Sequence, residues 1–219
     1  MTALSEADRS FILRRLHSLT GIVPIGGFLL FHLFENASAR HGAEAFNATV
    51  EKIADMPYVM VMEWAVLLLP ILFHAIYGLV ITRSSRPNVV SNSYPRNFAY
   101  LMQRITGIIA FVYITYHVVS TRFWALFVAH RNITYADMAM KLSNPAVFAL
   151  YVLGIVSVIY HFSNGLWSFS VTWGLVRTDV GQKRLACMTM VLFALLSVVG
   201  IDILSAFVLQ KSVLSHFGI

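Results

Sequence analysis

The chain has 219 residues, of which 58% are hydrophobic and only 12% are charged, and its net charge is +6. A soluble domain usually carries about 25% charged residues on its surface, so this composition excludes an ordinary water-soluble protein. The basic residues flank apolar runs and form no single patch, which argues against nucleic-acid binding and is typical of membrane topology signals. The single cysteine, Cys187, excludes internal disulfides, CxxCH haem attachment and cysteine-ligated iron–sulfur clusters.

Five apolar segments are long enough to cross a bilayer, which takes about 20 residues in a helix. Polar, proline-bearing stretches separate them. We therefore expect an all-α integral membrane protein with five transmembrane helices, in one domain that covers residues 1–219. The predicted spans are 16–36, 58–82, 100–129, 146–176 and 185–210.

The basic residues also indicate how these spans are oriented. With the N-terminus in the cytoplasm, most of the 16 lysines and arginines fall on the cytoplasmic side, as the positive-inside rule requires. We therefore predict a cytoplasmic N-terminus and an external C-terminus.

Spans one and two resemble spans three and four, which indicates an internal duplication of a helix pair. Both odd-numbered spans carry a Thr-Gly pair near the cytoplasmic side, and both even-numbered spans contain His-x-x-x-Gly-Leu. The two repeats run in parallel, so the first four spans are expected to form one bundle. The first repeat supplies His32 and His74, and the second supplies His117 and His161.

The rise of a helix converts sequence position into depth. At about 1.5 Å per residue, His32 lies roughly 25 Å from the cytoplasmic edge of its span, and His74 lies about 13 Å from that edge. The repeat then matches His32 with His117 and His74 with His161. One pair is expected near the outer face and the other nearer the cytoplasm.

Ionisable side chains inside a membrane are functional candidates because they need a partner there. Two facing imidazoles can fill both axial positions of a haem iron. We predict an outer haem b between His32 and His117, and an inner haem b between His74 and His161. A glycine four residues after each inner histidine would leave room for the flat macrocycle.

Three other interpretations remain open for these histidines. Each histidine could bond only a backbone carbonyl or a neighbouring helix. A zinc site would gather three or four ligands together, and a transporter built from repeats would use histidines as proton relays. Four polar residues near the cytoplasmic edge are candidates for the propionate side of the inner haem: His17, Ser18, Gln103 and Arg104.

Four stretches of the sequence resemble one known family. They are 14–19, 42–47, 103–108 and 161–173, the last of which reads HFSNGLWSFSVTW. On these motifs the chain is similar to the cytochrome b membrane-anchor subunit of succinate:menaquinone oxidoreductases and quinol:fumarate reductases. The type is the one with two haems and a single anchor, and the similarity is greatest to the subunit of Bacillus-like bacteria.

The resemblance implies a subunit of an enzyme in a bacterial cytoplasmic membrane, without a dicarboxylate site of its own. It implies a flavoprotein partner, an iron–sulfur partner on the cytoplasmic face, and a membrane quinone, menaquinone, as substrate. The quinone site would lie near the outer haem and use an acidic residue, with Glu44 as first candidate and Glu63 as second. Simple solvation of both carboxylates, or pairing with Arg40 or Arg122, stays open. The alternative function is the di-haem cytochrome b of a hydrogenase or formate dehydrogenase.

Overall fold

The computed structural model describes residues 5–209, which contain helices and connecting turns but no strand. Four of the helical elements are π-helical (η1, η3, η4 and η5), and η2 is a 3₁₀-helix. In chain order the elements are α1 (Glu6–Thr20), η1 (Gly21–Gly26), α2 (Gly27–Asn36), η2 (Ala37–His41), α3 (Ala43–Ala54), α4 (Val59–Val61), η3 (Met62–Leu68), α5 (Leu69–Arg83), α6 (Pro95–Val118), η4 (Val119–Phe123), η5 (Ala125–Ala129), α7 (Tyr135–Leu142), α8 (Pro145–Thr172) and α9 (Asp179–Leu209).

These elements join into five helices that are long and apolar enough to cross a membrane, which confirms the predicted all-α fold with five spans. The five helices cover Glu6–His41, Val59–Arg83, Pro95–Ala129, Pro145–Thr172 and Asp179–Leu209.

The ends of several spans differ from the prediction: the first helix runs from Glu6 to His41, the third begins at Pro95, the fourth ends at Thr172 and the fifth begins at Asp179. Two of these differences have clear local reasons. The first helix begins at Glu6, well before residue 16, because Ser5 and Asp8 form a capping box around its first turn. The fourth helix ends at Thr172 and not at residue 176, because Gly174 adopts a left-handed conformation with φ of +71°. Residue 210, the last of the predicted fifth span, lies outside the described residues.

The first span is not a regular α-helix throughout. Pro24 lies inside it, and a proline has no N–H for the helical ladder and crowds the preceding turn. The π-helical segment η1 accommodates this proline, and such segments are frequent at functional sites. This irregular turn places Gly21 against His74 of the second span and Gly26 against Phe162 of the fourth.

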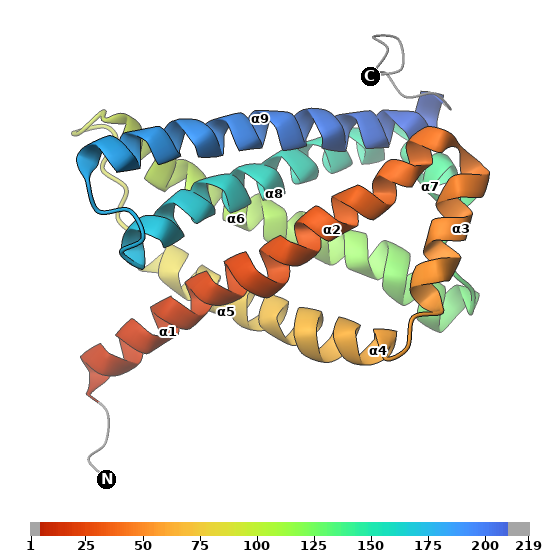
Figure 1. The fold of residues 1–219 in the computed structure, drawn as a ribbon, viewed down its shortest axis with the longest axis horizontal. Coiled ribbons are helices and arrows are strands. Elements are labelled where there is room, and N and C mark those ends of the chain that lie inside the picture. Colours follow the sequence, from red (N-terminus) through yellow and green to blue (C-terminus); the bar gives the residue numbers. More distant parts are fainter. Residues whose placement is uncertain (1–4, 210–219) are drawn as a thin grey trace.

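The spans pack as a bundle with the fifth helix along one side (Figure 1). Helix α8 packs along both α6 and α9, and α1 packs against α5. Helices α3 and α7 lie together at the end of the bundle opposite the N-terminus, here called the α3/α7 end. The most closely packed side chains join this end to α9, among them Phe46, Tyr135, Leu142 and Phe207.

An ion pair holds η2, which leads into the α3/α7 end, against α9. Arg40 Nε lies 2.9 Å from Asp202 Oδ2, and the Asp202 side chain is only 3% exposed. Nearby, the Tyr135 hydroxyl donates a hydrogen bond of 2.6 Å to the Ala206 carbonyl. A carboxylate within a membrane span is expected to be paired, and Asp202, for which the sequence suggested no role, is paired across two elements.

Candidate functional site

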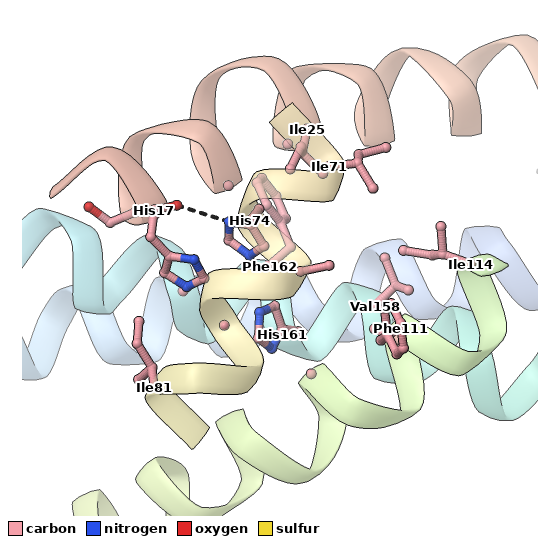
Figure 2. Close-up of a pocket in the computed structure, with 18 of the residues that line it drawn as sticks. His17, Ile25, Ile71, His74, Ile81, Phe111, Ile114, Val158, His161 and Phe162 are labelled. Carbon is pink, nitrogen blue, oxygen red and sulfur yellow. Dashed lines mark hydrogen bonds between the residues drawn. The ribbon is translucent and has the colours of Figure 1, made fainter. Parts of the chain in front are cut away.

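A cavity of about 610 Å³ lies between the first four spans, lined from Phe11 in α1 to Leu68 and Phe123 in the second and third spans (Figure 2). Its size falls in the range of about 300–1,000 Å³ that is usual for ligand and cofactor sites. Three histidines, His17, His74 and His161, line it, and most of the remaining wall is apolar. Its polar lining residues include Arg14, Arg15, Ser18, Gln103 and Arg104.

The inner histidine pair faces across this cavity. The ring centroids of His74 and His161 are 6.1 Å apart, and the two rings are inclined by 87°. Metal–imidazole bonds are about 2 Å long, so two nitrogens on opposite sides of one metal are about 4 Å apart. Each ring centroid lies farther from the metal than the bonding nitrogen does, so centroids 6.1 Å apart are compatible with one iron bound between the two rings.

Both inner histidines are held by the same kind of hydrogen bond. His74 Nδ1 lies 2.9 Å from the carbonyl oxygen of His17, and His161 Nδ1 lies 3.0 Å from that of Gln103. A carbonyl oxygen only accepts, so each Nδ1 carries the proton and donates. Each Nε2 therefore keeps a free lone pair, which is the arrangement found in metal-binding histidines.

The Thr-Gly pairs of the two repeats explain how these rings fit. A Cβ atom on Gly21 would lie 2.5 Å from His74 Cε1, and one on Gly107 would lie 2.9 Å from His161 Cε1. Any side chain at these positions would displace the imidazole. The repeated glycines therefore make equivalent contacts with equivalent histidines.

The glycines that follow the inner histidines have a different contact from the one expected. A Cβ atom on Gly78 would lie 3.1 Å from His17 Cε1, and one on Gly165 would lie 3.5 Å from Gln103 Nε2. The sequence pointed to these two glycines for clearance of a macrocycle. In the structure their nearest side-chain neighbours are His17 and Gln103, whose carbonyls accept hydrogen bonds from His74 and His161.

Two buried nitrogens of residues that line the cavity, His17 Nδ1 and Arg104 Nε, have no hydrogen-bond partner among the described residues. Buried polar atoms are normally satisfied, so these two fit the carboxylates of a bound haem. Arg14 lines the same cavity and was not singled out from the sequence, although it lies three residues before His17, on the same helix face. Ser18 is already engaged, because its Oγ accepts a hydrogen bond of 3.0 Å from Trp173 Nε1.

The outer histidines also come together, but in different surroundings. The ring centroids of His32 and His117 are 5.8 Å apart, with 71° between the rings. His117 Nδ1 lies 3.3 Å from the Tyr151 hydroxyl, and Asn36 Nδ2 lies 3.3 Å from His32 Nδ1. Neither outer histidine lines the cavity. The Nδ1 atoms of the outer pair lie next to side-chain groups, whereas those of the inner pair donate to backbone carbonyls.

The two candidate carboxylates lie toward the α3/α7 end. Glu63 Oε2 accepts hydrogen bonds from Arg122 at 2.7 Å and 3.1 Å, which joins the second span to the third. Trp64 and Phe123 stack beside this pair with centroids 6.3 Å apart. Glu44 is exposed in the first turn of α3. Of the alternatives left open, the pairing of Glu63 with Arg122 is therefore present.

The four histidines predicted as ligands lie as two separate pairs, whereas a zinc site gathers three or four ligands together. Among residues 5–209, no three His, Cys, Asp or Glu side chains are grouped so as to hold a metal ion. Two ligands on opposite sides suit an iron whose other four ligands come from a porphyrin.

Known proteins with similar sequences are membrane subunits of succinate dehydrogenase. Residues 95–201 match the family described as succinate dehydrogenase/fumarate reductase transmembrane subunit. The chain is 42% identical over 203 residues to the succinate dehydrogenase cytochrome b558 subunit of Bacillus subtilis (strain 168), which covers 93% of this chain and 100% of that protein. It is 30% identical over 86 residues to the succinate dehydrogenase hydrophobic membrane anchor subunit of Archaeoglobus fulgidus, covering 39% of this chain and 66% of that protein.

Proposed function

Since the chain belongs to the succinate dehydrogenase/fumarate reductase transmembrane-subunit family, we propose that it passes electrons between an iron–sulfur subunit and a membrane quinone. It is the cytochrome b anchor in this proposal, and the chemistry of succinate and fumarate belongs to a flavoprotein partner. The observation that carries the proposal is the cavity with His74 and His161, whose Nδ1 atoms are both bonded to carbonyls.

His74 and His161 would hold the inner haem b, and His32 with His117 would hold the outer one. A bound haem would supply one-electron redox chemistry, and ligation by two histidines would leave no position for oxygen. His17 and Arg104 would face the propionates of the inner haem, since both have an unpartnered buried nitrogen at the cavity. The apolar wall keeps water away from the iron, which together with the axial ligands influences its reduction potential.

The quinone, menaquinone in this proposal, would bind near the outer pair, where Glu63 and Arg122 meet. A guanidinium can donate hydrogen bonds to a quinone carbonyl, and a carboxylate can take up a proton from a quinol. Glu63 is supported over Glu44 by its position on a membrane span beside Arg122. Glu44, the first candidate from the sequence, becomes the second, because it lies in α3, outside the five candidate spans.

The end of the bundle that carries the N-terminus would face the cytoplasm of a bacterial cell and contact the iron–sulfur subunit. The distribution of basic residues supports this orientation. His74 and His161 would hold a one-electron carrier near this face, and His32 and His117 would hold a second one nearer the quinone. The path between them covers part of the membrane thickness, so it would be sensitive to the transmembrane potential.

Haem quantification tests the proposal directly. The complex with its soluble subunits should contain two haems b per anchor chain, and His161→Ala should lose the inner one. His130→Ala is the matched control, because that histidine lies beyond the third span in a left-handed turn. If a variant complex fails to assemble, its haem content is measured from the optical spectrum of membranes from the variant strain. An unchanged haem content in both His74→Ala and His161→Ala would refute the proposed ligation.

A further inference from the structure

His161 is held by a closed set of hydrogen bonds between α6 and α8. Its Nδ1 donates to the Gln103 carbonyl at 3.0 Å, and Gln103 Nε2 donates back to the His161 carbonyl at 3.0 Å. The Asn164 amide then donates from Nδ2 to Gln103 Oε1 at 2.7 Å. Asn164 is buried, with 8% of its surface exposed. The side-chain amides of Gln103 and Asn164 therefore link α6 to α8 next to this histidine.

The first repeat has no such set around His74. The residue equivalent to Gln103 is His17, whose ring stacks flat on His74 with centroids 3.9 Å apart. The residue equivalent to Asn164 is Tyr77, which contacts the His17 ring edge-on at 5.9 Å. One hydrogen bond and aromatic stacking hold His74, whereas an amide network holds His161.

We propose that Gln103 and Asn164 are positioning residues that fix the plane of the His161 imidazole. This inference rests on the proposed haem ligation by His161, and it gives Gln103 a role other than contact with a propionate. An axial imidazole can turn about its bond to iron, and the Nδ1 hydrogen bond selects one orientation. Asn164 occupies Gln103 Oε1, so the Gln103 amide must present its N–H group to the His161 carbonyl.

Loss of the Asn164 amide would release this constraint. Gln103 Oε1 would become a buried acceptor without its donor, which is costly in a protein interior. A flip of the Gln103 amide would place two acceptors opposite each other, at Oε1 and the His161 carbonyl. The local backbone and the imidazole plane would then be free to shift, while His161 itself remained as a ligand.

The angle between the axial imidazole planes can be measured by electron paramagnetic resonance. Near-perpendicular planes, such as the 87° between His74 and His161, produce a strongly anisotropic signal from low-spin ferric haem, and more parallel planes reduce its largest g value. Asn164→Leu, which keeps the approximate volume but removes the amide, should lower and broaden this g value for the inner haem. The haem content and the outer-haem signal should stay unchanged.

Ser163→Ala is the matched control, since Ser163 is the neighbouring residue, is fully buried, and has no hydrogen-bond partner for its Oγ among the described residues. It should leave both signals as in the wild type. If Asn164→Leu fails to retain the inner haem, Asn164→Ser is measured instead, with the same shift expected. An inner-haem signal identical to wild type in the variant that retains haem would overturn the proposal. A wild-type complex without an inner-haem signal would instead refute the ligation by His161.

Discussion

His17 contacts His74 in two independent ways: its carbonyl accepts the proton of His74 Nδ1 at 2.9 Å, and its ring lies parallel to the His74 ring at 3.9 Å. The first contact belongs to the main chain and survives substitution. The second belongs to the imidazole and does not. His17 therefore combines a role that any residue can fill with one that needs a flat side chain.

The side chain of His17 should be needed to retain the inner haem but not to ligate it. His17→Ala should keep a low-spin inner haem that is lost faster to a haem acceptor such as apomyoglobin. His17→Phe should lose haem more slowly than His17→Ala, because a phenyl ring restores the stacking. If His17→Ala lacks the inner haem as completely as His74→Ala, then His17 is itself a ligand.

Alanine at the repeated glycines should disturb the inner site. Gly21→Ala or Gly107→Ala would place a methyl group within 3 Å of a ligand ring, and such overpacking costs about 1–3 kcal/mol. Both variants should bind less inner haem, measured from the optical spectrum per mole of protein. Gly27→Ala is the control, because a Cβ there meets nothing within 4 Å. Equal haem content in all three variants would contradict the close contact.

Glu63 should be needed for quinone turnover. Glu63→Gln removes a proton acceptor whose contribution to general acid–base catalysis is typically about 100-fold or more. Electron transfer from succinate to a menaquinone analogue should fall by that order, while reduction of a water-soluble acceptor by the partner subunits stays constant. Glu44→Gln serves as the comparison, and loss of quinone activity in that variant alone would assign the proton transfer to α3.

Lys141 should raise the reduction potential of the outer haem. Its Nζ donates to the Ser120 carbonyl and lies 3.2 Å from Ser120 Oγ, close to the segment that carries His117. A positive charge there favours the ferrous state, so Lys141→Gln should lower the midpoint potential. Each 1.4 kcal/mol of lost interaction corresponds to about 59 mV for one electron. Lys141→Arg should keep the wild-type potential, and a redox titration in which both variants shift equally would exclude a charge effect.

Asp137 should make the stability of the α3/α7 end dependent on pH. Hydrogen bonds from Arg131 at 2.6 Å and 2.8 Å, with others from Thr134, hold the pKa of Asp137 well below its usual range. The folded state then binds the proton less tightly than the unfolded state. The stabilisation is present above the unfolded pKa of about 3.9, and it is lost as the pH falls below it.

Thermal unfolding in detergent tests this dependence. Asp137→Asn should unfold at a lower temperature than the wild type at neutral pH, and the difference should shrink as the pH falls below about 4. The effect should be small, because solvent screens the exposed Arg131. A difference that is constant across this range would show that charge is not involved.

The sequence alone determined the number of spans and how the four histidines pair. Bilayer thickness and helix rise are constants, so a count of apolar residues predicts a span and a position within it predicts a depth. The internal repeat then matched His32 with His117 and His74 with His161, and the structure brings the rings of each pair together. That these pairs bind haem remains a prediction that the experiments above test.

Only the tertiary structure decided which atoms support the paired histidines. The roles of Gly21, of the His17 carbonyl and of Asn164 depend on contacts between different helices. Such contacts depend on how far each helix is rotated and shifted against its neighbour, and packing between spans sets both quantities. The same reason hid the pairing of Asp202 with Arg40, because no periodicity within one helix indicates which residue of another helix will face it.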